Sequence, residues 1–109
     1  MRLVVRDRGR LVLLDPAEIE WIVADRDYLR IHALGLELLM RGRMKEMASR
    51  LPPAAFARIH RSAIVNVNAV RELIPRSNRE FVVVLRDGTR LRMSRSYRES
   101  LAALLPGEK

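Results

Sequence analysis

Apolar and polar residues alternate in short runs along most of the chain, a pattern typical of β-strands that bury one face. The runs at 3–6 and 11–14 flank the turn-like sequence Asp7-Arg8-Gly9-Arg10 and predict a hairpin that ends at Asp15-Pro16. Further strands are predicted at 19–24, 28–33, 36–40, 70–74, 81–85 and 91–93. Because tight turns without intervening helices join these runs, we expect antiparallel pairing and a mainly β fold.

One segment after the fifth run has the period of a helix instead. Met44, Met47, Ala48 and Leu51 are spaced three and four residues apart, and Pro52-Pro53 ends the segment. A short helix is therefore predicted here, with its apolar stripe covering one open edge of the sheet.

A second helix is predicted at the end of the chain. Ser96 and Glu99 have the S-x-x-E spacing of a capping box, and Pro106-Gly107 would terminate the helix. Its apolar stripe consists of Tyr97, Leu101, Leu104 and Leu105. Ser94 and Arg95 would then lie at a strand-to-helix junction, where Arg95 can project from a rigid base.

The pair Asp87-Gly88 is the strongest hairpin signal in the chain and predicts a two-residue type I′ turn. This turn fixes a register, because the side chains of a strand alternate between its two faces. The register would place Val82 and Val84 opposite Met93 and Leu91 on a dry face, and Val83 and Leu85 opposite Arg92 and Arg90 on an amphipathic face.

Composition narrows the class of protein. The chain has 109 residues, of which 49% are hydrophobic, and this fits a single folded domain. No apolar run exceeds five residues and no cysteine is present, which excludes a membrane helix, a disulfide and a thiolate metal site. The first residues lack a secretory signal, so we expect a cytoplasmic protein without membrane contact from this segment.

The charge balance points to a polyanionic partner. Lysine and arginine total 21 against 13 acidic residues, which gives a net charge of +8, and all but two of the basic residues are arginine. The planar guanidinium group pairs bidentately with phosphates and guanine edges, which favours nucleic acid. Arginine-rich composition also arises when arginine simply serves as a solvated cation, and composition alone leaves both interpretations open.

Candidates for catalysis are few. They are His32, His60, Asp25, Asp27 and Glu37, together with scattered serines. The two histidines do not have the spacing of a metal-binding motif, and the two aspartates fit a short turn. We therefore expect no enzyme activity, no metal and no cofactor.

The trio His60-Arg61-Ser62 is bracketed by apolar residues within the segment 56–68. It has a structural interpretation, in which His60 packs near the core and Ser62 caps a turn. It also has a functional one, in which Arg61 bonds the O6 and N7 atoms of guanine and Ser62 holds a phosphate.

Seven arginines follow in the last third of the chain, with only Glu80, Asp87 and Glu99 to balance them. They are Arg76, Arg79, Arg86, Arg90, Arg92, Arg95 and Arg98. In many proteins an arginine-rich segment of this kind is simply a solvent-exposed surface. Here the arginines fall on loops, on a hairpin face and at a helix start, and we favour a phosphate-binding surface on one side of the domain.

Several segments, in this order and spacing, resemble the LytTR DNA-binding domain of bacterial transcriptional regulators. They are Ile19-Glu20-Trp21-Ile22, Asp27-Tyr28-Leu29-Arg30-Ile31-His32, Leu51-Pro52, the run from His60 to Asn66, Leu85-Arg86-Asp87-Gly88-Thr89, and Ser94-Arg95-Ser96-Tyr97-Arg98. Together they span about residues 3–105. The resemblance implies about ten short, mostly antiparallel strands in small stacked sheets, with two short helices.

The resemblance further implies sequence-specific binding of double-stranded DNA, with loops in successive major grooves and a bent duplex. On matching positions, Arg61 and Arg95 would contact bases, and the loop at Tyr28 is the third contact. Candidates for backbone contact and positioning are His60, Ser62, Asn66, Arg76, Asn78, Arg79, Ser94 and Arg98. Asp27 departs from the family pattern, because its carboxylate would be repelled by phosphate, and Ala63 replaces a residue that is commonly aromatic.

The family usually places such a domain behind a phosphoacceptor receiver or a membrane sensor. We interpret residues 1–109 as one LytTR-like domain without either. It is a stand-alone regulator or, as we favour, a domain excised from a response regulator of a two-component system or a similar regulator. The free domain is expected to be a monomer that pairs on direct-repeat promoter sites. Two alternatives remain: an RNA or single-strand binder, for which the five aromatic residues are scarce, and a basic module that binds an acidic protein.

Overall fold

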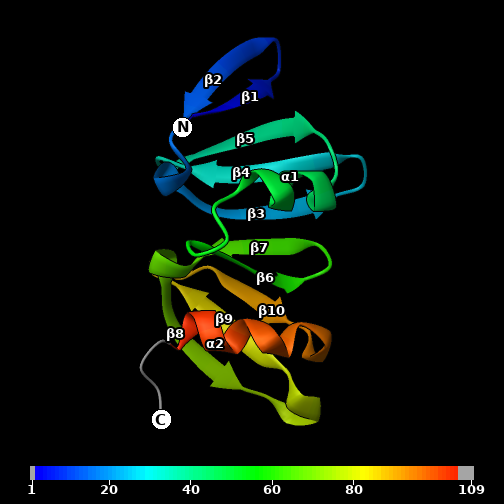
Figure 1. The fold of residues 1–109 in the computed structure, drawn as a ribbon, viewed down its shortest axis with the longest axis vertical. Helices are drawn as coiled ribbons and strands as arrows, with labels where there is room; N and C mark the ends of the chain where they lie inside the picture. Colours follow the sequence, from blue (N-terminus) through cyan, green and yellow to red (C-terminus); the bar gives the residue numbers. More distant parts are fainter. Residues whose placement is uncertain (1, 106–109) are drawn as a thin grey trace.

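In the computed structural model, which describes residues 2–105, ten strands form three antiparallel sheets stacked along the long axis of an elongated molecule of 44 × 27 × 25 Å (Figure 1). The first sheet pairs β1 (Leu3–Asp7) with β2 (Arg10–Leu14). The second has the order β5 (Leu36–Arg41), β4 (Tyr28–Ala33), β3 (Ile19–Asp25), β7 (Ala63–Asn66) and β6 (Phe56–His60). The third has the order β10 (Arg90–Met93), β9 (Phe81–Leu85) and β8 (Val70–Pro75). The mainly β class and the antiparallel pairing expected from the sequence are confirmed.

Three strands of the five-stranded sheet, β3, β7 and β6, are buried on both faces by two separate cores. On β3, Ile22 packs into the core shared with the β1–β2 hairpin, whereas its neighbours Trp21 and Val23 pack into the core shared with the three-stranded sheet. On β7, Ile64 and Val65 divide between the two cores in the same way. Because side chains alternate across a strand, a middle layer of this kind needs apolar residues at successive positions. The second core does not extend over β4 and β5, whose outer face keeps the polar side chains of Arg30 and Glu37 at the surface.

The β1–β2 hairpin is attached to the five-stranded sheet through one buried carboxylate. Asp7 accepts hydrogen bonds from the Leu39 amide of β5 at 2.8 Å and from the guanidinium groups of Arg10 and Arg8 at 2.9 and 3.1 Å. These donors, led by the Leu39 amide, lower the pKa of Asp7 to about 2. The hairpin is therefore held to β5 by an ionised group with a satisfied hydrogen-bonding shell.

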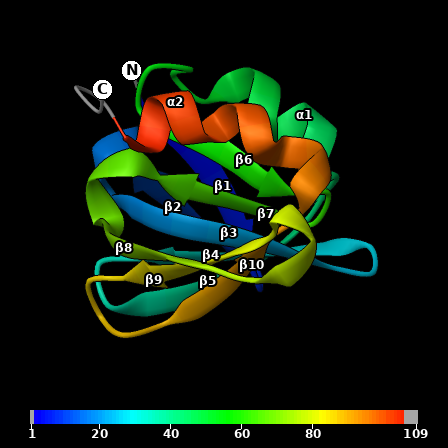
Figure 2. The same cartoon turned by 90° about the horizontal axis from the view of Figure 1, so that it is seen from below.

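Helix α1 (Met44–Arg50) forms where the sequence predicts it, but it covers a face of the sheet and not an open edge. Met44 and Met47 are buried in the same core as Ile22 and Ile64, which lie on the two inner strands β3 and β7. An edge offers unpaired backbone groups, which apolar side chains cannot satisfy, so the apolar stripe packs on the sheet face. Helix α2 (Leu101–Leu104) lies on the same side of the molecule (Figure 2).

The predicted turn between β9 and β10 is wrong by one residue. The loop has three residues, closed by a bond from the Gly88 amide to the Leu85 carbonyl at 2.9 Å and by one from the Leu85 amide to the Thr89 carbonyl at 2.8 Å. Only Gly88 in this loop has a positive φ, +90°, whereas a type I′ turn needs two such residues.

The extra loop residue shifts the register and exchanges the two faces of the hairpin. Val84 lies opposite Arg90, Val83 opposite Leu91 and Val82 opposite Arg92. The face with Val83, Leu85 and Met93 is therefore the dry one, and Arg90 and Arg92 lie over Val84 and Val82 on the other.

The C-terminal helix begins earlier than predicted, as a 3-10 helix over Arg95–Ser100 that leads into α2. Its cap is Ser94, whose Oγ accepts a hydrogen bond from the Ser96 amide at 3.2 Å, and not Ser96. The junction of strand and helix at Ser94 and Arg95 is as expected. The predicted terminator Pro106-Gly107 lies outside the described residues.

Candidate nucleic-acid interface

Four connecting segments lie along one side of the long molecule, on the right in Figure 1, and the second view agrees (Figures 1 and 2). Starting at the end of the molecule that carries the β1–β2 hairpin, they are the β3–β4 turn, the β6–β7 turn, the start of the 3-10 helix after β10, and the β8–β9 connection. We call this side the loop edge and define it as residues 26–28, 60–62, 94–98 and 76–79. It brings together all the predicted contact residues except Asn66.

The β6–β7 turn holds its backbone rigidly and leaves Arg61 exposed. The Ser62 amide donates to His60 Nδ1 at 3.1 Å, and the Ser62 carbonyl accepts from the Ala24 amide of β3 at 2.9 Å. Arg58 donates from Nη2 to the Arg61 carbonyl at 2.6 Å. The guanidinium group of Arg61 makes no hydrogen bond to any of residues 2–105, so it is available to a ligand.

His60 is fixed in one tautomer beside this arginine. Its Nδ1 accepts the Ser62 amide proton, so in the neutral ring the proton resides on Nε2. Partial burial, followed by the nearby charges of Arg92 and Arg61, lowers the pKa of His60 below its usual value, against a smaller opposing effect of Glu80. At neutral pH the ring is therefore an uncharged Nε2–H donor on the loop edge.

The 3-10 helix that carries Arg95 is anchored to β6. The Ser94 amide donates to the Ile59 carbonyl at 2.9 Å, and the Tyr97 amide donates to the Ser94 carbonyl at 2.9 Å. The Arg58 guanidinium carbon lies 5.5 Å from the centre of the Tyr97 ring, and the Ser100 hydroxyl donates to the Arg58 carbonyl. Arg95 is thus an exposed side chain on a base that is tied to the neighbouring turn.

Arg58 is the residue that sequence reasoning missed. It contacts both the Arg61 carbonyl and the Tyr97 ring, so it joins the two arginine-bearing segments. In the sequence it belongs to Phe56-Ala57-Arg58, which precedes the His60–Asn66 run in the family resemblance, but no role was assigned to it. Its role depends on contacts that only the fold creates.

The β8–β9 connection presents Arg76, Asn78 and Arg79 as exposed side chains. Asn78 and Arg79 both adopt left-handed backbone conformations, with φ of 61° and 63°. The segment is closed by a bond from the Arg76 amide to the Glu80 carbonyl at 2.8 Å, and the Glu80 carboxylate pairs with Arg92 at 3.0 Å. The short 3-10 turn therefore holds two arginines at the edge of the third sheet.

Tyr28 begins β4 and is 42% exposed, immediately after the β3–β4 turn. The acidic residues near Tyr28 differ in whether they form ion pairs. Arg30 pairs with Asp25 at 2.8 Å and with Glu37 at 3.1 Å, and Asp25 is the main cause that raises the pKa of Arg30. Asp27 has no ion pair within the described residues, so a negative charge remains next to Tyr28.

Two predictions do not fit this edge. Asn66 is only 6% exposed; its Nδ2 donates to the Ile19 carbonyl at 2.9 Å and its Oδ1 accepts from the Asn68 amide at 2.9 Å. Its side chain is engaged within the fold, and we exclude it from the interface. Arg86 and Arg90 flank the β9–β10 turn, which lies on the opposite side of the molecule, so the arginines of 76–98 do not all converge on one side (Figure 1).

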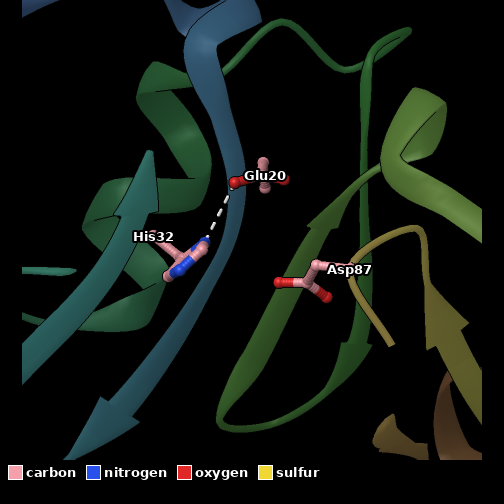
Figure 3. Close-up of side chains that lie close together, drawn as sticks. All are labelled: Glu20, His32 and Asp87. Carbon is pink, nitrogen blue, oxygen red and sulfur yellow. Dashed lines mark hydrogen bonds and ion pairs between the residues drawn. The ribbon is translucent and has the colours of Figure 1, made fainter. Parts of the chain in front are cut away.

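A cluster of potential metal ligands lies beside that same β9–β10 turn, away from the loop edge. The ligand atoms of Glu20, His32 and Asp87 are within 4.8 Å of one another, and His32 Nδ1 is 3.0 Å from Glu20 Oε1 (Figure 3). Trp21 stacks on the His32 ring at 4.8 Å, while the Thr89 amide is the main cause that lowers the pKa of Asp87. These side chains connect the second and third sheets and place two carboxylates opposite the basic edge.

No helix within the described part of the chain is long and apolar enough to cross a membrane.

The chain is similar to a family of DNA-binding domains and to bacterial regulatory proteins. Residues 9–106 match the family model described as the LytTr DNA-binding domain. The chain is 24% identical over 95 residues to the sensory transduction protein LytT of Bacillus subtilis, covering 87% of this chain and 39% of that protein. It is 30% identical over 84 residues to the transcriptional regulatory protein YpdB of Escherichia coli K12, covering 77% of this chain and 34% of that protein.

In structure, the chain is similar to the LytTr DNA-binding domain of a putative methyl-accepting/DNA response regulator from Bacillus cereus, with a TM-score of 0.84, 24% identity and 96% of each chain covered. The fold is therefore the one that the sequence resemblance implied. With the family match spanning most of its length, the chain belongs to the LytTr DNA-binding domain family.

Proposed function

We propose that this domain binds double-stranded DNA at a specific sequence and thereby regulates transcription, with Arg61 and Arg95 as the residues that contact base edges. The observation that carries the proposal is the position of these two exposed arginines. They stand on adjacent segments of the loop edge, which are joined by the contacts of Arg58 with the Arg61 carbonyl and the Tyr97 ring. A guanidinium group held on a rigid base can meet guanine O6 and N7 together, which is the commonest specific contact in the major groove.

The other exposed and partly exposed groups of the loop edge contact the phosphate backbone in this proposal. Arginine side chains, hydroxyls and backbone amides make such contacts and fix the position of a protein on the duplex. In this role we place His60, Ser62, Arg76, Asn78, Arg79, Ser94 and Arg98. Each arginine that neutralises a phosphate releases counterions, so we expect affinity to fall steeply with salt.

Tyr28 is the third contact, at the end of the loop edge near the β1–β2 hairpin. Its exposed ring and hydroxyl can reach a base edge or a phosphate, but the uncompensated charge of Asp27 opposes close approach of the backbone. We therefore expect Tyr28 to contribute less than Arg61 or Arg95.

The curated relatives suggest the setting in which the domain works. The chain spans about two fifths of the length of LytT and about a third of YpdB, which are named as sensory transduction and transcriptional regulatory proteins. We propose that it is the output domain of a cytoplasmic response regulator. In that setting two copies would bind a direct repeat, each as a monomer before binding, with neither catalysis nor a cofactor.

The proposal is tested by selection from a random duplex library at near-physiological salt. We expect enrichment of a short motif, and of two copies at a spacing of one helical turn when longer duplexes are used. Retention of DNA without enrichment would contradict sequence-specific binding and leave an electrostatic binder.

The alternatives lead to different outcomes in the same experiment. A single-strand binder needs exposed aromatic rings for base stacking, and Tyr28 is the one aromatic side chain among the strongly exposed large hydrophobic residues described. Preference for single strands in competition would favour it. Retention of an acidic protein but of no nucleic acid would favour the protein-binding module.

A further inference from the structure

A hollow of about 630 Å³ lies between the β1–β2 hairpin and the adjoining strands of the five-stranded sheet. Four arginines from three different elements line it, namely Arg6, Arg8, Arg41 and Arg50. Tyr28 and an apolar floor that includes Met40 complete the lining. We call this hollow the arginine groove.

The arginine groove contains no acidic residue in its lining. Within residues 2–105, Arg6, Arg41 and Arg50 make no ion pair with a carboxylate. The nearby carboxylates of Asp7 and Glu37 pair with other arginines. Arg8 differs, since it pairs with Asp7 at 3.1 Å and donates to the Glu37 carbonyl at 3.2 Å. At least three like charges therefore converge without compensation, and a polyanion that enters the groove relieves their repulsion.

The wall of the groove is rigid enough to act as a binding surface. Asp7 holds the hairpin to β5 through the Leu39 amide, and its pairing with Arg8 positions that side chain at the groove. Tyr28 is paired with Arg41 across the β4–β5 ladder. The contacts of Asp7 thus join the hairpin to the sheet at the groove, and the Tyr28–Arg41 pairing joins the two strands of the sheet that line it.

The arginine groove is continuous with the loop edge. Tyr28 belongs to both, because it follows the β3–β4 turn and also lines the groove. Arg41 lines the groove and also an adjoining hollow of about 450 Å³, which is lined by Arg26 and Arg43 and by the carboxylate of Asp27. A surface with three arginines and one aspartate therefore joins the third contact loop to the arginine groove.

The length of the molecule allows a duplex to reach this end. The long axis measures 44 Å, and one turn of B-DNA occupies only about 34 Å. A duplex that lies along the loop edge, with Arg61 and Arg95 at its centre, passes Tyr28 and then meets the hairpin.

We propose that the arginine groove binds the sugar–phosphate backbone of the same duplex, on the flank beyond the bases contacted by the loop edge. This inference rests on the proposed function of that edge. Guanidinium groups bind phosphate oxygens bidentately, and the apolar floor suits the hydrophobic face of deoxyribose. The contact is independent of base sequence. Arg6 and Arg8 precede residue 9, where the family match begins, so these groove residues lie outside the matched region.

The test measures binding to the selected site in three duplexes: one with about ten extra base pairs on both sides, and two with one flank removed. We expect removal of one particular flank to weaken binding about tenfold at 0.1 M salt and to reduce the salt slope by about 2, which corresponds to about two lost phosphate contacts. Removal of the other flank should have little effect.

The variant that tests the groove is Arg6→Gln/Arg50→Gln, because both side chains are exposed and lack ion pairs among the described residues. The double variant should bind the duplex with both flanks as weakly as wild type binds the duplex that lacks the critical flank. On the duplex that lacks this flank, the double variant and wild type should have the same affinity. The matched control is Arg71→Gln/Arg90→Gln, two exposed arginines on other strands, which should keep the full flank effect. Circular dichroism and thermal unfolding establish that both proteins fold.

A double variant that retains the wild-type ratio between flanked and trimmed duplexes overturns the groove proposal while leaving the loop edge intact. Failure of the wild type to select any sequence overturns the loop-edge proposal instead. The groove is then tested with random duplexes of about 12 and 30 base pairs. Wild type should bind the longer duplex more tightly than the shorter one, and the double variant must lose this difference in affinity. Binding of a polyglutamate peptide that the double variant abolishes, without any flank effect, would assign the groove to an acidic protein segment.

Discussion

The guanidinium group of Arg58 lies 5.5 Å from the centre of the Tyr97 ring while its Nη2 atom donates to the Arg61 carbonyl. One side chain therefore sets the relation between the turn that carries Arg61 and the helix that carries Arg95. Neither contact touches DNA in the proposed complex, so Arg58 is a positioning residue.

Replacing Arg58 with methionine keeps the aliphatic stem but removes both contacts. We expect a loss of about 1–2 kcal/mol in the free energy of unfolding, from one cation–π contact and one charged hydrogen bond. Specific DNA affinity should fall about tenfold and non-specific affinity much less. Urea unfolding and fluorescence anisotropy measure the two effects. Arg58→Lys should not restore specificity, because an ammonium group lacks the planar fork; full restoration by lysine would argue against the positioning role.

Truncation of the two proposed base contacts separates specific from non-specific binding. Arg61→Ala and Arg95→Ala should each cost about 1–3 kcal/mol of binding free energy on the selected site and less on a random duplex. Anisotropy titrations on both duplexes give the difference, with Arg90→Ala on the opposite side of the molecule as the matched control. Equal losses on the two duplexes would reassign these arginines to phosphate contact.

The pH dependence of stability should reveal the role of Asp7. Its pKa in the folded protein, about 2, is below the ordinary 3.8, so the folded state favours the carboxylate. The corresponding stability is fully present above pH 3.8 and is lost as the pH falls toward 2. Wild type should therefore exceed Asp7→Asn in thermal stability at neutral pH, and the gap should narrow below pH 3.8. A gap independent of pH would show that the charge of Asp7 is unimportant.

His60 should titrate below the ordinary value of 6.5 in an NMR pH titration. Burial is the first cause, and the charge of Arg92 is the second, so Arg92→Gln should raise the midpoint only in part. Arg90→Gln, on the same strand but near the opposite end, serves as the control. Because the folded state binds fewer protons here, stability falls as the pH drops below 6.5. A midpoint at or above 6.5 would contradict the description of this turn.

Gly88 should tolerate no side chain without cost, even though a Cβ atom would meet nothing within 4 Å. The cost comes from its φ of +90°, which L-residues avoid. We expect Gly88→Ala to lower the free energy of unfolding by about 1–2 kcal/mol, and Gly88→Asn by less, since asparagine tolerates left-handed conformations better. Denaturant unfolding measures both. An alanine variant as stable as wild type would argue against the positive φ at Gly88.

Local patterns in the sequence predicted most strands, either from the alternation of apolar and polar residues or, as at Phe81–Leu85, from a short apolar run next to a turn signal. The β6–β7 hairpin was described only as a segment anchored at both ends, since β7 is buried on both faces and shows no alternation. The register of β9 and β10 depended on one residue of loop length, which the Asp87-Gly88 pair does not determine.

The parts of the interface missed from sequence are those that tertiary contacts create. Nothing in the sequence around Arg58 indicates that Tyr97 lies nearby. Nothing around Asn66 indicates that its side-chain amide donates a hydrogen bond to the Ile19 carbonyl. Exposed arginines were found from composition and turn position, whereas the residues that orient them require the fold.

Because the three sheets are stacked, the packing of side chains between them sets the distance between contact segments on different sheets. Packed sheets lie about 10 Å apart, close to the rise of three base pairs. The turns that carry Tyr28 and Arg61 belong to the middle sheet, whereas the connection at Arg76–Arg79 belongs to the third. The step from one group to the other is therefore set by the volume of residues such as Ile59, Val65 and Val83 between the layers. A change in core volume would therefore alter the spacing of the proposed DNA contacts, even at positions far from the proposed interface.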